Sequence, residues 1–439
     1  MEGATETVAG AEPGEGRFSV IARLARGELG SVRVLITIAL IWTIFQLQND
    51  RFLSAVNLTN LTLQIAAIGT ISVGVVLVLL LGEIDLSVGA VSGLAAGVMA
   101  VLTVKHGWNA DLAILAGLAT GALIGLFNGV MVTFFRIPSF VVTLAGLLAW
   151  QGALLYVLGD TGTINLPPST ITDLAGKFYG AGVGYAIAAI VTATTLGTGL
   201  LERRRRQKAR LETDPLAGIV IRTVIVGAAT FIAVSILVSD RGIPLSALIL
   251  VAFCAFFAWV TTRTRFGRHI FAVGGNAEAA RRAGIPINRV RIAVFTIASM
   301  MAAAGGILAA SRLIAVNQAS GSGDILLLAI AGPVIAGTSL FGGRGSVWSA
   351  LLGAVVIGSI SNGMDLLGLD SDVKYMITGG VLLAAVTVDA LARRQRERVQ
   401  VTYGPGYGNC ASASRGGGVS AAALITSTNA STLTVTPTA

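Results

Sequence analysis

The sequence predicts an all-α membrane protein, a polytopic bundle of about twelve transmembrane helices. Of its 439 residues, 54% are hydrophobic and only 12% are charged, whereas soluble domains carry about 25% charged residues. The chain also contains twelve mostly apolar stretches, and about 20 such residues suffice to cross a bilayer as a helix. The stretches are 32–48, 64–81, 86–104, 111–135, 138–158, 179–201, 217–238, 243–262, 290–311, 325–341, 347–364 and 375–392.

The basic residues predict the orientation of these helices. With the N-terminus inside and twelve crossings, 24 of the 31 Lys and Arg residues fall on the cytoplasmic side and six on the outer side. The block Arg203–Arg210 alone holds six of the inner cations. Cytoplasmic loops carry such an excess, so both termini are expected in the cytoplasm. The net charge of +9 then reflects membrane orientation, and no nucleic-acid partner is expected.

Composition divides the chain into three parts. Residues 1–30 are expected to form a cytoplasmic segment, because they contain charged residues and no apolar core of the signal-peptide type. Residues 31–400 form the expected membrane domain. Residues 401–439 are rich in Gly, Ser, Thr and Ala, and we expect a disordered low-complexity tail there.

Two acids lie at the junction of the second and third stretches, "LVLLLGEIDLSVGAV" (77–91). Gly82 weakens the helix there, and Asp85 is well placed to cap the next one by accepting from the amides of Ser87 or Val88. That capping role is the structural alternative to a functional one. Glu83 has no local partner of this kind. Ionisable residues at membrane depth are usually paired or functional, so we expect one of these roles for Glu83. The alternative is that Glu83 is simply solvated at the cytoplasmic mouth.

The fourth stretch carries glycines at every fourth position, namely Gly117, Gly121, Gly125 and Gly129. This spacing places them along one helix face, where a neighbouring backbone can approach closely. We therefore predict a packing groove rather than a random excess of glycine.

A short internal echo suggests an inverted repeat. "GALIGLFNGVM" (121–131) resembles "GAVVIGSISNGM" (353–364), and the two predicted helices run in opposite directions. Transporters commonly place their substrate path at such a repeat interface. A chance match of this length is the alternative.

The longest predicted cytoplasmic loop, 263–289, contains signals for a short helix at 277–283. Asn276 can cap it, Glu278 lies in the favoured first turn, and Gly284 suits the C-terminal cap before Pro286. A short helix projecting from a membrane domain suits a groove in another protein. An ordinary solvated loop helix is the alternative.

A glycine cluster after the tenth stretch predicts a tight turn rather than a phosphate-binding loop. Gly337, Gly342, Gly343 and Gly345 join two apolar stretches, and no G-x-x-x-x-G-K-[ST] motif occurs in the sequence. We therefore expect ATP hydrolysis, if transport uses it, to take place on a partner subunit.

Several stretches together resemble the permease subunits of bacterial ATP-binding-cassette sugar importers of the ribose, xylose and galactose type. "GEIDLSVG" (82–89) is similar to their "GGIDLSVG" signature and departs from it at Glu83, as in the xylose-type branch. The similarity extends over "FNGVMVTFFRIPSFVVTLAGLLAWQG" (127–152), "TRFGRHIFAVGGNAEAARRAGIPINRVR" (264–291) and "AIAGPVIAGTSLFGGRGSVWSALLGAVVIGSISNGMDLLG" (329–368). The insertion that holds the sixth and seventh stretches also fits the xylose branch.

The resemblance implies a type II-like inverted-repeat permease in the cytoplasmic (inner) membrane, surrounded by lipid. It implies a homodimer, a separate ATPase subunit, a periplasmic or extracellular sugar-binding protein, and a monosaccharide substrate, with xylose expected. No cofactor or metal is expected in this chain, and ATP would bind the partner subunit. The expected ATPase-coupling residues are Asn276, Glu278, Arg281, Arg282, Gly284 and Ile285. Candidates for the translocation path or gate are Glu83, Asp85, Ser87, Asn128, Trp150, Gln151 and Asn362, the last four being equally suited to helix–helix hydrogen bonds.

Two other functional classes are alternatives. An ion-coupled secondary sugar transporter would need a buried acid, which only Glu83 offers, and would not need a capped helix at 277–283. A membrane-embedded enzyme has little support, because the only histidines, His106 and His269, lie in loops predicted on opposite sides. No H-E-x-x-H motif occurs either.

Overall fold

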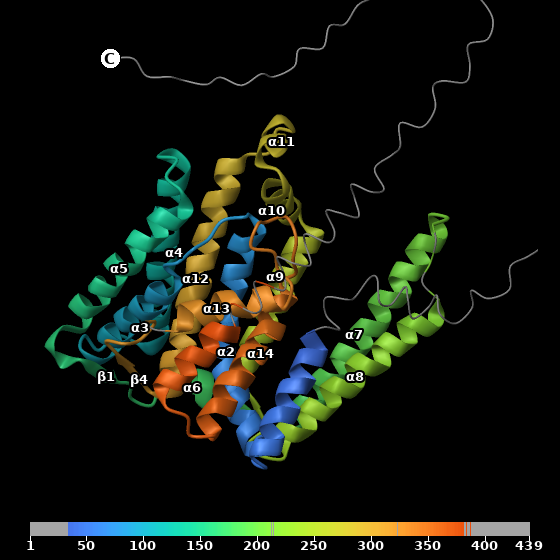
Figure 1. Cartoon of the computed structure of the whole chain (residues 1–439), viewed down its shortest axis with the longest axis horizontal. Helices are drawn as coiled ribbons and strands as arrows, with labels where there is room; N and C mark the ends of the chain where they lie inside the picture. The colour runs from blue at the N-terminus through green and yellow to red at the C-terminus, as the bar shows by residue number, and fades with distance from the viewer. Residues whose placement is uncertain are drawn as a thin grey trace, which may run out of the picture. The chain divides into compact units, whose positions relative to one another are not determined.

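Helices form most of the described chain and follow the predicted apolar stretches (Figure 1). The computed structural model describes residues 34–381 apart from 212, 214 and 323, together with 383 and 387. Within them, eight helices are long and apolar enough to cross a membrane. These are α2 (Ala55–Leu80), α4 (Ala110–Phe134), α5 (Ser139–Leu158), α7 (Ala181–Lys208), α8 (Leu216–Val238), α9 (Leu245–Arg263), α12 (Ile287–Leu313) and α14 (Trp348–Leu366).

Shorter apolar helices account for the remaining predicted stretches. They are Val34–Gln48, α3 (Val88–Val104) and α13 (Ile325–Ile335), and residues 371–381 are helical as well. The predicted all-α bundle is confirmed, while twelve crossings and the inverted repeat stay predictions. The N-terminal segment 1–30 and the tail 401–439 lie outside the described residues.

Short elements that were not predicted occupy the connections. Two are helices, α6 (Thr170–Gly176) and α10 (Arg265–Gly275), and η1 (Gly159–Thr161) is a single 3₁₀ turn. Strand β1 (Thr163–Asn165) pairs antiparallel with β4 (Ala315–Asn317), and β2 (Phe178–Tyr179) pairs with β3 (Ile243–Pro244). Helix α11 (Ala277–Arg282) lies at the opposite end of the bundle from α6, β1 and β4 (Figure 1).

Two predicted helix limits were wrong, and local capping and turn geometry explain where these helices begin and end. Helix α2 begins at Ala55 rather than at residue 64, because Ser54 caps it by accepting from the amide of Asn57 at 3.3 Å. Its first turns are partly polar, so an apolar criterion misses them. The tenth stretch stops being helical at Ile335 instead of 341, and Gly337 adopts a φ of +99° in the turn that follows.

The glycine stripe lies where α4 packs against α12 and α3. A Cβ added to Gly121 would lie 2.6 Å from the carbonyl oxygen of Ser299, and one on Gly129 would lie 2.8 Å from Cα of Ile292. The other two glycines of the stripe meet the backbones of α3 and α12 in the same way. The predicted packing groove is confirmed, and it brings α4 and α12 together backbone to backbone.

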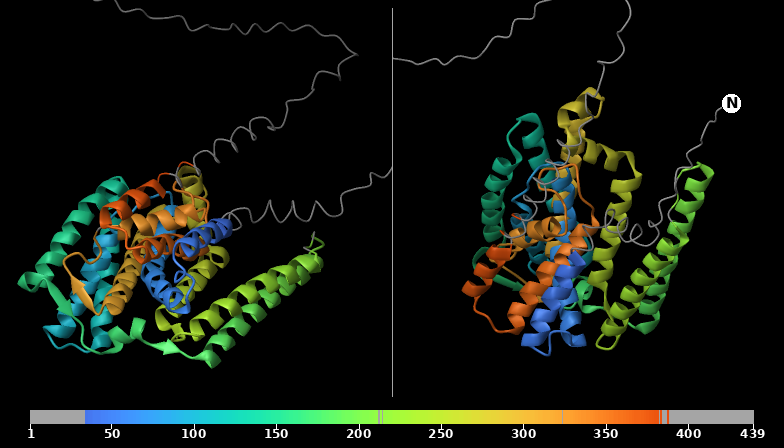
Figure 2. Two further views of the ribbon diagram at one scale, coloured as in Figure 1. Left: turned by 60° about the horizontal axis from the view of Figure 1, so that its bottom comes forward. Right: turned by 45° about the vertical axis from the view of Figure 1, so that its right-hand side comes forward.

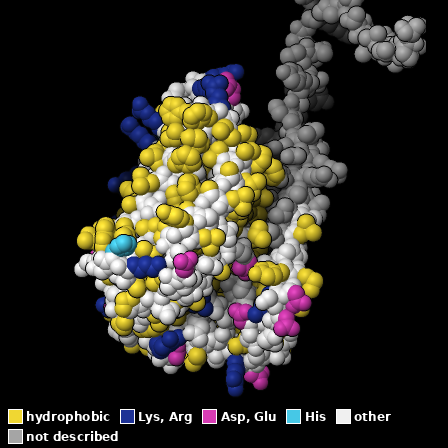
Figure 3. Space-filling model, turned by 90° about the vertical axis from the view of Figure 1, so that its left-hand side faces the viewer, with side chains coloured by type: hydrophobic (Ala, Val, Ile, Leu, Met, Phe, Trp, Pro, Cys, Tyr) yellow, Lys and Arg dark blue, Asp and Glu magenta, His cyan; other side chains and the backbone are white. Residues whose placement is uncertain are grey.

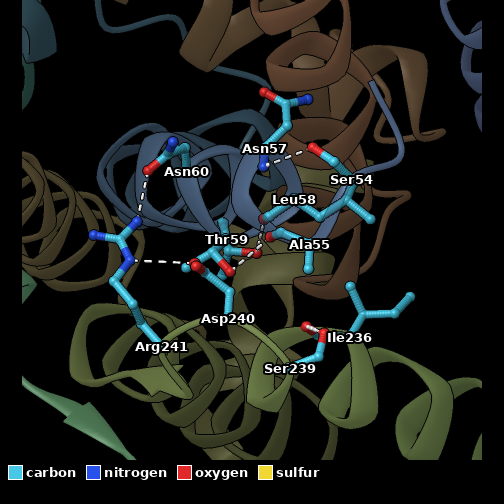
Figure 4. Close-up of polar contacts among 11 residues, drawn as sticks. Ser54, Ala55, Asn57, Leu58, Thr59, Asn60, Ile236, Ser239, Asp240 and Arg241 are labelled. Atoms are coloured by element: carbon cyan, nitrogen blue, oxygen red, sulfur yellow. Dashed lines mark hydrogen bonds and ion pairs between the residues drawn. The ribbon is translucent and has the colours of Figure 1, made fainter. Parts of the chain in front are cut away.

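The α7–α8 hairpin packs mostly on itself and stands at the side of the other helices (Figure 2). The end of the hairpin where α8 leads into α9 is tied to α2 by Arg241. The guanidinium donates to Oδ1 of Asn60 at 2.7 Å and pairs with Asp240 at 3.2 Å (Figure 4). It also lies 4.8 Å from the ring centroid of Phe178. One polar side chain therefore joins the hairpin, β2 and the core.

Exposed side chains on the flanks are largely apolar. In the face drawn in Figure 3, hydrophobic side chains form a broad band, and Lys and Arg side chains gather toward its margins. Apolar flanks between charged ends are what a bilayer requires of a spanning bundle.

Candidate functional site

The connector between α2 and α3 (residues 81–87) is an irregular segment held by backbone contacts. Gly82 adopts a φ of +76°, which a residue with a side chain rarely adopts. The amide of Gly343, in the glycine-rich turn before α14, donates to the carbonyl oxygen of Leu80 at 3.0 Å. Gly342 and Gly343 both have positive φ values, so the predicted tight turn is confirmed, and it packs on the connector.

Asp85 is buried in this connector, with 4% of its surface exposed. Its Oδ1 accepts from the amide of Ser87 at 2.8 Å and from the hydroxyl of Ser87 at 2.7 Å. The predicted amide contact is therefore present, although Ser87 itself occupies the N-cap position of α3. Burial raises the pKa of the Asp85 carboxyl, and the two Ser87 hydrogen bonds oppose that shift.

Helices α4 and α5 bring further polar groups to Ser87. The side-chain amide of Asn128, on α4, donates to Oγ of Ser87 at 3.1 Å, and both residues are fully buried. On α5, the hydroxyl of Thr143 accepts from the amide of Leu86 at 3.0 Å. These contacts fix the end of the connector between the two helices.

Trp150 completes this arrangement seven residues after Thr143 on α5, about two helical turns farther along. A Cβ added to Gly146 would lie 2.9 Å from Nε1 of Trp150 and 3.4 Å from Cβ of Ser87, so the indole lies over a glycine next to Ser87. The ring of Phe127 meets the indole edge to face, with centroids 6.0 Å apart. We call Asp85, Ser87, Asn128 and Trp150 the polar cluster.

Three buried atoms of the polar cluster have no hydrogen-bond partner among the described residues. They are Oδ2 of Asp85, Oδ1 of Asn128 and Nε1 of Trp150. Buried polar atoms are nearly always paired, so orphaned ones mark places where water or a ligand is expected. Two acceptors and one donor match the mixed hydrogen-bonding capacity of hydroxyl groups.

Two predicted path residues lie apart from this cluster. Gln151 follows Trp150 on α5 and is half-buried, outside the hydrogen-bonded group. Asn362, on α14, accepts from the side chain of Asn57 at 2.8 Å, near the start of α2. Because α2 has 26 residues at about 1.5 Å each, Asn57 and the connector lie near opposite ends of a long helix. Asn362 thus makes the helix–helix hydrogen bond that was its alternative role.

Glu83 has a partner that the sequence did not reveal. Its Oε1 lies 2.9 Å from Nη2 of Arg291, in the first turns of α12, and the two side chains are 15% and 27% exposed. This ion pair ties the connector to the helix that follows the 263–289 segment. Glu83 is therefore paired with Arg291, and the alternative that it is simply solvated is wrong.

The predicted helix in the 263–289 segment is confirmed almost residue for residue. Helix α11 spans Ala277–Arg282, and Oδ1 of Asn276 accepts from the amide of Ala279 at 2.9 Å. Gly284 has a φ of +77° and donates to the carbonyl of Arg281 at 3.0 Å. Ile285 donates to the carbonyl of Ala280 at 3.0 Å, which completes a Schellman C-cap.

The surface of α11 is charged on its exposed side. Glu278 pairs with Arg282 at 3.4 Å, with 61% and 80% of the side chains exposed. The preceding helix, α10, was not predicted; it begins after the cap Thr264 and buries Ile270 and Val273. The signal that could have revealed α10 is the amphipathic pattern that follows Thr264.

Helix α10 connects α11 to the connector through glycines. A Cβ added to Gly342 would lie 2.7 Å from the carbonyl oxygen of Gly274, at the end of α10, and 2.7 Å from the amide nitrogen of Gly82. Three segments therefore meet backbone to backbone. Helix α10 is thus in close contact with the start of the segment that carries Asp85.

Comparisons with known proteins agree with this arrangement. Residues 57–386 match the family described as the permease component of a branched-chain amino acid transport system. The chain belongs to this permease family. It is 36% identical over 385 residues to the xylose transport system permease protein of Escherichia coli (strain K12), covering 88% of this chain and 97% of the relative.

Other relatives of this permease span most of its length as well. The xylose transport system permease protein of Haemophilus influenzae is 34% identical over 363 residues, covering 82% of this chain and 96% of the relative. The ribose import permease protein of Escherichia coli (strain K12) is 31% identical over 361 residues, covering 82% and 92%. No solved structure matches the chain. The protein is thus a membrane-embedded component of a transport system.

Proposed function

We propose that this permease carries D-xylose across the cytoplasmic membrane as the membrane-spanning subunit of an ATP-binding-cassette importer. The similarity to two xylose permeases over nearly their full length carries the choice of substrate. The polar cluster supports it, because a neutral sugar is oriented by hydroxyl, amide and aromatic groups, beside which one acid can accept from a sugar hydroxyl. Ser87, Asn128 and Trp150 supply these three kinds of group.

ATP would be hydrolysed on a separate subunit that docks on α11, and this chain would hold no cofactor of its own. Asn276 and Gly284 shape the docking helix, while Glu278 and Arg282 form its exposed face. Closure of the ATPase would move α10 and α11, and the glycine contacts would pass that movement to the connector. A sugar-binding protein would deliver the sugar from outside to a homodimer embedded in lipid.

The orphaned atoms of the polar cluster are the groups that we assign to the translocation path or its gate. Asp85 and Asn128 offer free acceptors and Trp150 a free donor, so sugar hydroxyls that pass the connector can replace missing partners. Gln151 stays a candidate for the wall of the path. Asn362 contributes to the packing of α14 on α2 through its hydrogen bond with Asn57.

Two alternatives to this proposal are an amino-acid substrate and an ion-coupled mechanism. The family description names branched-chain amino acids, but a zwitterion needs a cation for its carboxylate, and the polar cluster contains no Lys or Arg. An ion-coupled secondary transporter would use Glu83 as its ion site, yet that carboxylate is paired with Arg291. Both observations favour the sugar importer.

Uptake of labelled D-xylose tests the proposal in cells that lack their own xylose uptake. Cells that express the permease with its sugar-binding protein should accumulate xylose only when the ATPase subunit is co-expressed. Unlabelled D-xylose should compete at lower concentration than D-ribose, and L-leucine should not compete. Competition by leucine, or equal uptake without the ATPase, would overturn the proposed function.

The proposed orientation, with α11 and both termini in the cytoplasm, rests on the charge asymmetry. Single cysteines at Ala283 and Thr170, which are both exposed, can be probed with an impermeant thiol reagent. To leave the introduced cysteine as the reactive one, Cys410 is replaced by Ser, while Cys254 can stay because it is buried. Labelling in intact spheroplasts is expected at 170 only. Labelling at 283 but not at 170 would reverse the topology.

A further inference from the structure

A hollow of about 800 Å³ opens beside α11, between the α4–α5 connection and the first turn of α12. Four arginines line it, namely Arg136, Arg281, Arg289 and Arg291, against one acid, Glu83. Because Glu83 is paired with Arg291, three guanidinium groups of the lining have no acid facing them in the hollow. The volume lies within the range of small-molecule sites.

Two polar groups of the lining are buried without a partner among the described residues. One is the hydroxyl of Thr133, a residue that is 7% exposed, and the other is Nε of Arg291. Thr120, on the same helix, instead donates to the carbonyl oxygen four residues earlier, at 2.9 Å. Thr133 thus forgoes the usual helical hydrogen bond at a wall of the hollow, where a ligand oxygen is able to accept one.

The backbone of the α4–α5 connection is strained at one of these arginines. Arg136 has a φ of +55°, in the left-handed region that favours glycine. Side chains held in this conformation cluster at binding sites, where the surrounding structure maintains them. A glycine would relieve the strain but would remove a cation from the hollow.

We propose that this hollow binds a small phosphate-bearing anion. Guanidinium groups match phosphate oxygens with forked donors, and a Thr hydroxyl adds a neutral one. The phosphate has two possible sources, a soluble sugar phosphate or the headgroup of an anionic lipid. Arg281 belongs to α11, so a bound anion would hold that helix against the α4–α5 connection.

The test uses the full chain, purified and placed in nanodiscs of phosphatidylcholine. Binding of D-ribose 5-phosphate, inorganic phosphate and D-ribose is measured by calorimetry at low and high salt. The two phosphates should bind and D-ribose should not, with binding weakened by salt. Arg136→Gln and Arg289→Gln should each weaken binding at least tenfold. Arg268→Gln, an exposed arginine of α10 outside the hollow, is the matched control and should bind as the unmodified chain does.

A second arm repeats these measurements in nanodiscs that contain phosphatidylglycerol. A lipid headgroup is the ligand if phosphatidylglycerol raises the melting temperature of the permease and abolishes binding of the soluble phosphates. Neither effect of phosphatidylglycerol should then be seen with Arg289→Gln. If no probe binds in either nanodisc, or all variants bind equally, the proposal is wrong. Loss of ATPase association in the arginine variants without anion binding also overturns it, in favour of a protein-docking surface. None of these readouts requires transport, so they stand apart from the test of the importer function.

Discussion

The central helices and the α7–α8 hairpin are all apolar enough to cross a membrane but are held in different ways. In α2 and α12, 78% and 61% of the most apolar window is buried, against 11% and 22% in α7 and α8. The central helices meet through glycines that bring backbones into contact, whereas Gly197 of α7 has no neighbouring atom within 4 Å of an added Cβ.

Hydropathy alone therefore does not tell which helices carry the function. The polar cluster, the connector and the contacts to α10 all belong to the tightly packed region. The hairpin is tied to it mainly at the end where α8 leads into α9, near Arg241. We therefore expect substitutions in the central helices to abolish folding or transport, and matched substitutions in the hairpin to be tolerated.

The largest expected effect comes from Gly125→Leu. A Cβ there would lie 2.7 Å from Cα of Thr296 and 2.8 Å from Cβ of Ser299, so α4 and α12 must separate. Overpacking of ordinary cores costs about 1–3 kcal/mol, and a clash with backbone should exceed that. Gly197→Leu in the hairpin is the matched control. We expect little monodisperse protein from Gly125→Leu in detergent chromatography and a normal yield from Gly197→Leu; equal yields would remove the distinction between the two regions.

The next effect concerns coupling rather than folding. Gly284→Val places a β-branched side chain in the left-handed region, at about 1–2 kcal/mol, and should disrupt the C-cap of α11. Ala283→Val, one residue earlier with a φ of −78°, is the control. Co-purification of the ATPase and xylose uptake should fall in Gly284→Val, and further when Glu278→Gln is added, while insertion stays normal. Full uptake in the double variant would favour the secondary-transporter alternative.

An intermediate effect is expected at the Glu83–Arg291 pair. Glu83→Gln leaves a partly buried guanidinium without its carboxylate, which should lower the free energy of unfolding by about 1–3 kcal/mol. Because the pair fixes the connector to α12, uptake should fall as well. Adding Arg291→Gln should restore part of the stability. If thermal unfolding shows the double variant no more stable than the single one, the pair does not hold the connector.

The smallest effect is expected where the hairpin meets the core. Arg241 is 45% exposed at its side chain, and exposed ion pairs and cation–π contacts contribute about 1 kcal/mol or less each. Arg241→Ala should lower the melting temperature slightly and leave uptake unchanged, with Asn60→Ala in the same range. A loss of transport in Arg241→Ala would give the hairpin a part in the mechanism and weaken the comparison.

Local patterns predicted local features well. The apolar stretches gave the helices, the four-residue glycine spacing gave the α4–α12 contact, and Asn276 with Gly284 gave both ends of α11. Features that depend on distant partners were missed. The pairing of Glu83 with Arg291, and the separation of Asn362 from Asn128, arise from helix packing that short motifs do not encode. The strands β1 to β4 were also missed, because two or three residues carry too little pattern.

Energised uptake by the purified system distinguishes an ATP-driven xylose importer from an ion-coupled one. The permease is reconstituted into liposomes with the ATPase subunit enclosed and the sugar-binding protein outside, and entry of labelled D-xylose is measured. We predict uptake that requires ATP in the lumen, stops with a non-hydrolysable analogue and is unaffected by an ionophore that collapses proton and sodium gradients. Uptake that follows an imposed ion gradient in the absence of the ATPase would show that the permease is a secondary transporter and not an ATP-driven importer.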